Sequence, residues 1–271
     1  MTARTQIGGR DLIAATVVGV LLIVAAGSAL WWRTEALVAV VLLLLIAAFV
    51  DLVRALDGPK RPVLSVLVSA TIVMLPATVW FGATGQLAGV LTLFAGAVLW
   101  LLARAVTLQR LMRAAGTVFA GVWVLLPASF AFTILSAANG RAQLGLVIGV
   151  VALMDIGGYA VGVPFGRHKL SVRLSPNKTV EGLLGGLVIS VVAATVAWPI
   201  IFTAGHAWQG AVFGVLISIA AACGDIAESG VKRALDVKDF GTFLPGHGGV
   251  LDRIDGLLFA LPVATVLFAV L

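Results

Sequence analysis

Charged residues are scarce in this sequence: Asp, Glu, Lys and Arg together make up 11% of its 271 residues, against about 25% in soluble domains. Apolar residues make up 61%, and the mean hydropathy of the chain is +1.13. This balance excludes a soluble globular protein and a disordered chain. The sequence has a single cysteine, Cys223, which excludes an internal disulfide and with it a disulfide scaffold.

Long apolar runs occupy most of the chain. At roughly 20 apolar residues per membrane-spanning helix, hydropathy predicts nine spans, at residues 12–31, 36–53, 63–82, 86–103, 117–135, 144–163, 182–203, 210–229 and 250–271. The predicted fold class is therefore all-α, a polytopic integral membrane helix bundle of about nine transmembrane helices. The first run exceeds the roughly 7 to 15 apolar residues of a signal peptide, so we expect it to be retained as a span.

Lys and Arg alternate between the segments that join these spans. Of the 18 basic residues, 16 fall in every second segment, counting from the N-terminus. Because cytoplasmic loops carry the excess of Lys and Arg, this predicts a cytoplasmic N-terminus and cytoplasmic loops after spans 2, 4, 6 and 8. The net charge of +6 then reflects topology and attraction to membrane lipid, without a nucleic-acid partner. An excess of arginine over lysine, with many Ala, Gly and Val residues, suggests a GC-rich bacterial genome. Together with the predicted spans, it leads us to expect a multi-pass protein of a bacterial inner membrane.

Acidic residues are absent from residues 58–154 and concentrate after them. Eight of the twelve lie between Asp155 and Asp255. The sequence therefore predicts apolar N-terminal membrane helices in residues 1–143. Residues 144–271 are predicted to form a C-terminal catalytic membrane region, with its active site facing the cytoplasm.

The eighth predicted span ends in four polar side chains spaced i, i+3, i+4 and i+7, namely Asp225, Glu228, Ser229 and Lys232. If the helix continues through them, they share one face. Ionisable groups in a span cost roughly 2.5 to 3.5 kcal/mol each, so they persist mainly where they line a wet cavity. Asp252 and Asp255 are expected to share a face at the start of the ninth span. If the loop folds back, the carboxylates meet, and hard oxygen ligands beside phosphate suit Mg²⁺.

A second polar cluster begins inside the sixth predicted span with Asp155 and continues into the following loop with Arg167 and Lys178. Ser175 or Thr179 is expected to cap the seventh span, and a helix N-terminus beside Lys178 is an anion site. The loop at residues 238–249 combines glycines with cations. Such a loop allows backbone N–H groups to approach anionic oxygens.

These residues resemble the phosphatidate cytidylyltransferases, also called CDP-diacylglycerol synthases. The family signature runs from Ser229 to Asp255 as S-x-x-K-R, K-D-x-G and L-P-x-H-G-G-V-x-D-R-I-D, and every fixed position is filled. Upstream, the D-x-x-x-Y that begins at Asp155, F-G-R at residues 165–167 and S-P-N-K-T-V-E-G at residues 175–182 are similar to further family motifs. Two departures occur: Asn177 replaces a usual lysine, and residues 156–158 read I-G-G. The motifs cover roughly the C-terminal 40% of the chain.

The resemblance implies transfer of CMP from CTP to phosphatidate, giving CDP-diacylglycerol and pyrophosphate in phospholipid biosynthesis. It implies Mg²⁺ as a cofactor and allows a monovalent cation such as K⁺. The residues assigned to catalysis are Asp225, Lys232, Asp252 and Asp255, and those assigned to the metal are Asp225, Asp252 and Glu228. The residues assigned to substrate binding are Ser175, Lys178, Arg167, Ser229, Arg233, Lys238, Asp239, His247 and Arg253.

Elementary chemistry agrees with this implied reaction. A lipid phosphate that attacks the α-phosphorus of CTP is already anionic, so it needs no strong general base. The site needs carboxylates for a metal, cations for the leaving pyrophosphate, and an interfacial position.

Two other functions stay open at this point. A secondary transporter would suit Asp155 and Asp225 in glycine-interrupted helices, but it predicts midplane sites and repeats in both halves. A related CTP-dependent lipid or polyprenol kinase would need similar phosphate chemistry, and the complete signature disfavours it. Small residues such as Gly182, Gly185 and Gly186 permit close helix packing or a homodimer without requiring one.

Overall fold

The computed structural model describes residues 6–7, 10–11, 27–28, 32–171, 175–241 and 249–271. The helices are α2 (Thr34–Ala55), α3 (Leu64–Phe81), α4 (Ala83–Leu102), α5 (Leu108–Ala120), α6 (Leu126–Leu135), α7 (Gly140–Phe165), α8 (Val180–Ile201), α9 (Ala207–Ala234) and α10 (Asp255–Val270). A π-helical turn, Gly121–Leu125, joins α5 to α6, and 3₁₀ turns occupy Gly58–Lys60 and Leu251–Arg253. The strands form two short antiparallel hairpins, β1 (Gln6–Ile7) with β2 (Arg10–Asp11) and β3 (Lys169–Ser171) with β4 (Ser175–Thr179).

The all-α membrane fold is confirmed. Within the described ranges, seven helical segments are long and apolar enough to cross a membrane, and α10 is a shorter apolar helix. The predicted span at 12–31 lies almost wholly outside the described residues. The total of nine spans and the side of the membrane on which the N-terminus lies therefore stay predictions.

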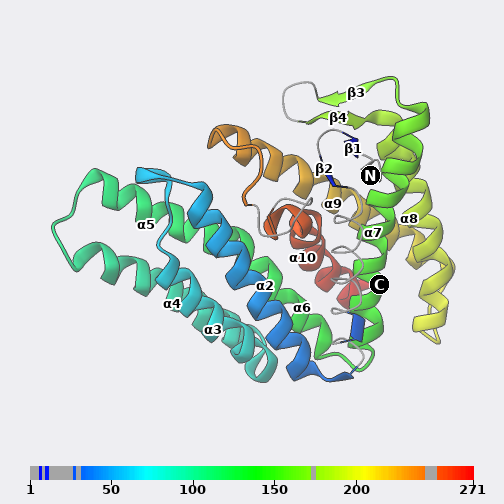
Figure 1. Cartoon of the computed structure of the whole chain (residues 1–271). Coiled ribbons are helices and arrows are strands. Elements are labelled where there is room, and N and C mark those ends of the chain that lie inside the picture. The colour runs from blue at the N-terminus through cyan, green and yellow to red at the C-terminus, as the bar shows by residue number, and fades with distance from the viewer. Residues whose placement is uncertain (1–5, 8–9, 12–26, 29–31, 172–174, 242–248) are drawn as a thin grey trace, which may run out of the picture. The chain divides into compact units, whose positions relative to one another are not determined.

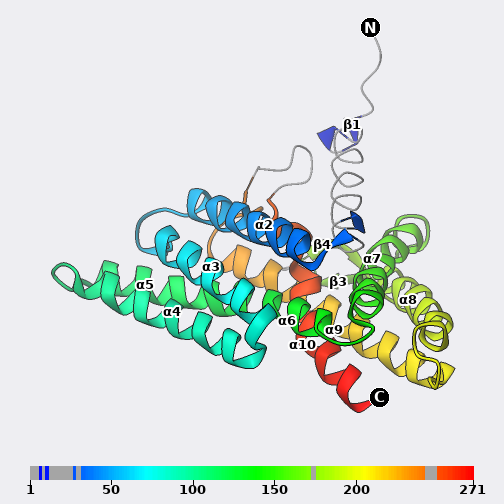
Figure 2. The same ribbon diagram turned by 90° about the horizontal axis from the view of Figure 1, so that it is seen from below.

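Contacts divide the chain into two compact units. The N-terminal unit comprises Met1–Phe132 and Leu235–Ile254, and the C-terminal unit comprises Thr133–Ala234 and Asp255–Leu271. In the N-terminal unit, α3 and α4 lie side by side and α2 packs on α3 (Figures 1 and 2). Most of the signature segment, residues 235–254, thus belongs to the unit built from the N-terminal helices.

In the C-terminal unit, α8 packs against both α7 and α9, and α10 packs on α9 (Figure 2). Glycine permits this close packing, since a Cβ at Gly186 would lie 2.3 Å from the carbonyl oxygen of Met154 on α7. Between α8 and α9, the buried hydroxyls of Ser190 and Ser218 hydrogen-bond at 2.7 Å. Small residues at helix crossings are typical of membrane bundles, where close van der Waals contact drives association.

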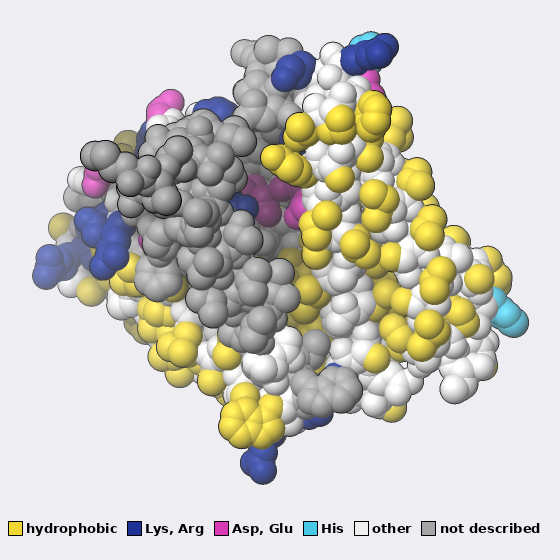
Figure 3. Space-filling view, turned by 45° about the vertical axis from the view of Figure 1, so that its right-hand side comes forward, with side chains coloured by type: hydrophobic (Ala, Val, Ile, Leu, Met, Phe, Trp, Pro, Cys, Tyr) yellow, Lys and Arg dark blue, Asp and Glu magenta, His cyan; other side chains and the backbone are white. Residues whose placement is uncertain are grey.

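The outer face of α8 is apolar and exposed. It carries five aliphatic side chains spaced four residues apart, namely Leu184, Val188, Val192, Val196 and Ile200. Figure 3, which brings the side with α7 and α8 forward, shows hydrophobic side chains spread over this surface. A stripe of this kind is a liability in water and is suited to hydrocarbon. The protein is therefore an integral membrane protein.

Candidate active site

The charged stripe predicted at the end of the eighth span is present. Because α9 continues to Ala234, Asp225, Glu228, Ser229 and Lys232 lie on one helix at the predicted spacing. Lys232 Nζ donates to Glu228 Oε2 at 2.8 Å, and the two side chains are only 13% and 3% exposed. A carboxylate this deeply buried requires a partner, which Lys232 supplies one helical turn away.

The loop between α7 and α8 is a β-hairpin, which the sequence analysis did not predict. Lys169 pairs with Thr179 across the two strands. Thr179 is the N-cap of α8, accepting the Gly182 N–H at 3.1 Å, and this confirms one of its two predicted capping residues. The Glu181 carboxylate accepts the backbone N–H groups of Arg167 at 3.0 Å and His168 at 3.2 Å. The hairpin is therefore fastened to the first turn of α8.

This hairpin brings Lys178 to α9. Lys178 Nζ donates a hydrogen bond to Asp225 Oδ2 and forms an ion pair with it. The two residues are 47 positions apart in the sequence, and they come from the two polar clusters that the sequence analysis treated separately. A charge-assisted pair of this kind is strong and directional, so it fixes both groups at one point.

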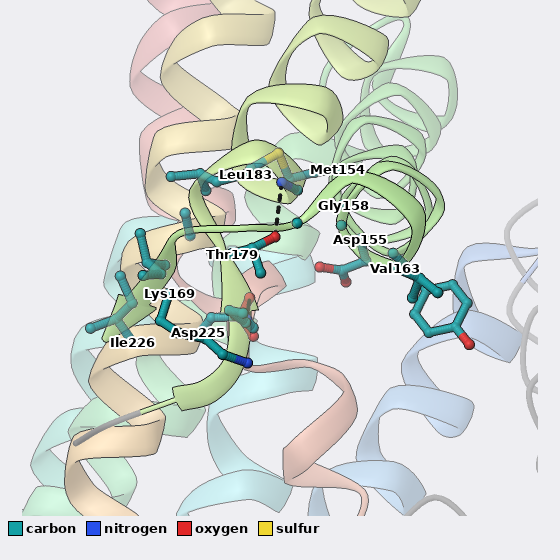
Figure 4. A pocket seen from close by; sticks show the side chains of 16 residues that line it. Met154, Asp155, Gly158, Val163, Lys169, Thr179, Leu183, Asp225 and Ile226 are labelled. Carbon is teal, nitrogen blue, oxygen red and sulfur yellow. Dashed lines mark hydrogen bonds and ion pairs between the residues drawn. The ribbon is translucent and has the colours of Figure 1, made fainter. Parts of the chain in front are cut away.

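A cavity of about 710 Å³ opens beside this ion pair, lined by α7, the hairpin, α8 and α9. Its charged lining residues are Asp155, Lys169, Lys178 and Asp225, and apolar groups such as Met154, Leu170 and Leu183 line the rest. Figure 4 shows Asp155 and Asp225 reaching the cavity from different helices. A mainly apolar pocket with a few converging polar groups is typical of a small-molecule site.

Lys169 is a cavity residue that the sequence analysis missed. It is exposed and lies in β3, directly before Leu170, which also lines the cavity. Nothing in the sequence distinguishes this lysine from other loop lysines. Only the β-hairpin places it beside the cavity.

Asp255, the first residue of α10, joins the α9 cluster. It lies within hydrogen-bonding reach of Asp225 and Glu228 and interacts with both electrostatically. Gly224 makes this contact possible, since a Cβ there would lie 2.6 Å from the Asp255 carbonyl oxygen. The predicted meeting of two carboxylate-bearing helix ends is thus seen between α9 and α10.

The donor chemistry of this cluster fits a hard cation. Three carboxylates that lie this close repel one another, and Lys178, Lys232 or a metal ion relieves that repulsion. Within the described part of the chain, no group of three or more His, Cys, Asp or Glu side chains forms a ready-made metal cage. A cation held here would therefore depend on further oxygen ligands, such as substrate phosphates and water.

Asp252 behaves differently from Asp255, which corrects one prediction. Asp252 lies in the 3₁₀ turn Leu251–Arg253, whereas Asp255 opens α10, so the two do not share an α-helical face. The Asp252 carboxylate accepts the N–H of Gly249 at 2.8 Å and the N–H of Phe240 at 3.3 Å. The helix starts later than predicted, at Asp255, because residues 251–253 form a 3₁₀ turn in which the Asp252 side chain accepts two backbone N–H groups.

The other predicted site residues divide between the two units. Lys238, Asp239 and Arg253 belong to the N-terminal unit, with Asp252. Arg167, Ser229 and Arg233 belong to the C-terminal unit. Of Ser175, only the backbone is described, in β4, and His247 lies outside the described residues. The assignments of these residues to substrate stay predictions.

Comparison with known proteins extends the resemblance to nearly the whole chain. The model of the cytidylyltransferase family matches residues 12–271. A phosphatidate cytidylyltransferase of Mycobacterium bovis is 35% identical over 285 aligned positions, covering 98% of this chain and 91% of the relative. One from Mycobacterium tuberculosis is 35% identical, covering 98% and 85%. One from Staphylococcus haemolyticus is 43% identical over 118 positions, 44% of this chain and 45% of that protein.

Proposed function

The chain belongs to the cytidylyltransferase family, and from this premise we propose that it transfers the cytidylyl group of CTP to phosphatidate. The products are CDP-diacylglycerol and pyrophosphate. The observation that carries the proposal is the cavity in which the Lys178–Asp225 ion pair lies against apolar walls. Such a site accepts phosphate groups and a lipid together, as a reaction between a soluble nucleotide and a membrane lipid requires.

In this reaction an oxygen of the lipid phosphate forms a bond to the α-phosphorus of CTP. The bond between the α-phosphorus and the bridging oxygen to the β-phosphorus breaks, and pyrophosphate leaves with that oxygen. The entering phosphate is already anionic, so the protein supplies position and positive charge and needs no strong base. Lys178 and Lys232 are the cations placed beside the carboxylate cluster for this purpose.

A divalent cation, Mg²⁺ in this proposal, completes the site. Asp225, Glu228 and Asp255 would hold it, and Asp252 stays a predicted ligand. When bound, the ion polarises the phosphoryl oxygens and offsets their developing charge. The family resemblance also allows a monovalent cation such as K⁺.

The proposed location is a bacterial inner membrane, with the cavity open to the cytoplasm. The alternation of Lys and Arg along the chain supports this orientation. The membrane that surrounds the protein then also supplies its lipid substrate. The match over 98% of the chain to relatives named phosphatidate cytidylyltransferase favours this function over a transporter or a lipid kinase.

Pyrophosphate release tests the proposal. Detergent-purified protein is given CTP, phosphatidate and Mg²⁺, beside the variants Asp225→Asn and Asp252→Asn. Asp57→Asn is the matched control, since Asp57 is exposed and makes no cap hydrogen bond with its side chain. We expect release that needs both substrates and the metal, is lost in the first two variants and persists in the control. A folded wild type that releases no pyrophosphate would contradict the proposal.

A further inference from the structure

One buried carboxylate belongs to the helices that the mechanism leaves without a role. Asp51 lies in the second half of α2, a candidate membrane span, and is 4% exposed. An acid in such a segment is expensive, at roughly 2.5 kcal/mol or more on insertion scales, and is usually retained for function. Asp51 is one of four acids in the first 57 residues, and none of the family motifs includes it.

Asp51 packs directly against the signature segment at Gly241. A Cβ built on Gly241 would lie 2.2 Å from Asp51 Cγ and 2.4 Å from both its Cβ and Oδ2. The backbone of Gly241 does not have a positive φ, so glycine is required at this position for space and not for conformation. The Asp51 side chain therefore occupies the volume that any side chain at residue 241 would need.

The segment around Gly241 is held from its other side as well. A Cβ at Gly249 would lie 2.9 Å from the Gly241 nitrogen and 3.2 Å from Asp252 Oδ2. Asp252 itself accepts the N–H groups of Phe240 and Gly249. Gly241 is thus enclosed between the Asp51 carboxylate and Gly249.

Two further contacts tie this segment to the N-terminal helices. Phe240 is fully buried and meets the Trp123 ring edge-on, with centroids 6.1 Å apart. Lys60 donates to the Leu235 carbonyl oxygen at 3.1 Å and pairs with Asp236 at 3.0 Å. These contacts anchor the K-D-x-G stretch just before its lysine and at its third residue, and Asp51 contacts its glycine.

We propose that Asp51 is a positioning residue for cytidylyl transfer: its buried carboxylate fixes the backbone at Gly241 and thereby the signature residues Lys238 and Asp239. This inference rests on the proposed function for its link to catalysis, and on the Asp51–Gly241 contact alone for its structural part. The N-terminal helices then have a role in catalysis, since their side chains contact and position this part of the signature. A misplacement of about 1 Å at a reacting site costs on the order of 100-fold in rate.

The test uses full-length protein in detergent with three single variants. Asp51→Asn keeps the shape and removes the charge, Gly241→Ala fills the contact from the other side, and Glu35→Gln is the control. Glu35 is an exposed acid in the first turn of the same helix. Each variant is measured for kcat, KM for CTP, unfolding temperature and amide hydrogen exchange of residues 235–241.

We expect Asp51→Asn and Gly241→Ala to lower kcat/KM by about 10- to 100-fold and to speed exchange in residues 235–241. Helices α7 to α9 should keep their exchange, and Glu35→Gln should match the wild type. Wild-type kcat, KM and exchange in Asp51→Asn would overturn the inference. So would a fall in unfolding temperature with exchange raised throughout the chain and unchanged kcat per folded molecule, since that is a purely structural role.

The exchange measurement separates this inference from the proposed function. If the wild type makes no CDP-diacylglycerol, the proposed function fails, yet local exchange in Asp51→Asn still reports whether Asp51 holds the segment. If the wild type is active and local exchange is unchanged in Asp51→Asn, the inference fails alone.

Discussion

At the scale of the residue, the site is built from charge pairs between side chains of opposite sign. Lys178 meets Asp225 from another element, and Lys232 meets Glu228 on the same helix. The i, i+4 pair could be predicted from helical spacing, because the periodicity places the two side chains on one face. The pairing of Lys178 with Asp225 could not be predicted, because the two residues are 47 positions apart and meet only through the packing of the hairpin, α8 and α9.

Replacing Lys232 tests the buried pair. In Lys232→Met the Glu228 carboxylate stays buried without its cation, which typically costs about 3 to 5 kcal/mol. We expect a lower unfolding temperature together with loss of activity. In Glu228→Gln/Lys232→Met the unfolding temperature should recover while activity stays lost. Thermal unfolding in detergent checks both, and recovery of activity in the double variant would show that the pair is only structural.

Replacing Lys178 tests the ion pair at the cavity. Lys178→Met removes a charge-assisted hydrogen bond, and we expect kcat/KM to fall by about 10- to 100-fold. Lys178→Arg keeps the charge and should retain more activity than Lys178→Met. Steady-state kinetics with CTP and phosphatidate decide this, and equal activity of both variants with the wild type would remove Lys178 from the site.

At the scale of the element, hydropathy predicted which segments are helices but not where they end. The helix that begins at Leu108 was expected from residue 117, because Arg110 and Arg113 lower the hydropathy of its first turns. Both guanidinium groups lie over the Trp100 ring, at 4.7 and 5.2 Å from its centroid. The sequence signal is averaged over a window, whereas the helix end is decided by such single contacts and by the Thr107 cap.

The β3–β4 hairpin could not be predicted for a related reason. Its β4 strand contains Pro176, which argues against a strand unless it lies at an edge. In a two-stranded sheet both strands are edge strands, so the proline is tolerated. What holds the hairpin is the Glu181 carboxylate bonded to the backbone of Arg167 and His168, a contact without periodicity.

The crossing of α7 and α8 sets the cavity and can be tested with alanine. A Cβ at Gly182 would lie 2.7 Å from the Gly158 carbonyl oxygen and 3.1 Å from Gly162 Cα. Gly182→Ala should therefore separate the two helices and reduce both activity and unfolding temperature. Gly149→Ala, on α7 with no atom within 4 Å of its added Cβ, should stabilise the helix by up to about 1 kcal/mol. Similar effects of the two variants would contradict the close packing.

At the scale of the whole molecule, the sequence motifs predicted catalysis in the C-terminal half. The structure adds that residues 235–254 fold with the N-terminal unit. Composition could not predict this, since the N-terminal helices are apolar and contain none of the family motifs. Asp51 was a visible signal, an acid within an apolar run, but nothing in the sequence identifies its partner at Gly241.

The predicted orientation has its own test. In a Cys223→Ser background, cysteines are introduced at Ala105, in the loop after α4, and at Ala138, in the loop before α7. With the N-terminus cytoplasmic, Ala105→Cys should react with a membrane-impermeant maleimide only after permeabilisation, and Ala138→Cys in intact cells. The opposite pattern would reverse the topology, and labelling of both from outside would contradict the span count between them.

Cytidylyl transfer moves the α-phosphorus of CTP into the lipid, so the position of the transferred phosphorus distinguishes it from other reactions. Purified protein with phosphatidate and Mg²⁺ is given CTP labelled with ³²P at either the α- or the γ-phosphate, and the lipid is extracted. We expect label in the lipid from α-labelled CTP and none from γ-labelled CTP, and Asp225→Asn should transfer label from neither. Label from γ-labelled CTP would indicate a kinase, and an unlabelled lipid from folded, membrane-embedded protein would contradict cytidylyl transfer altogether.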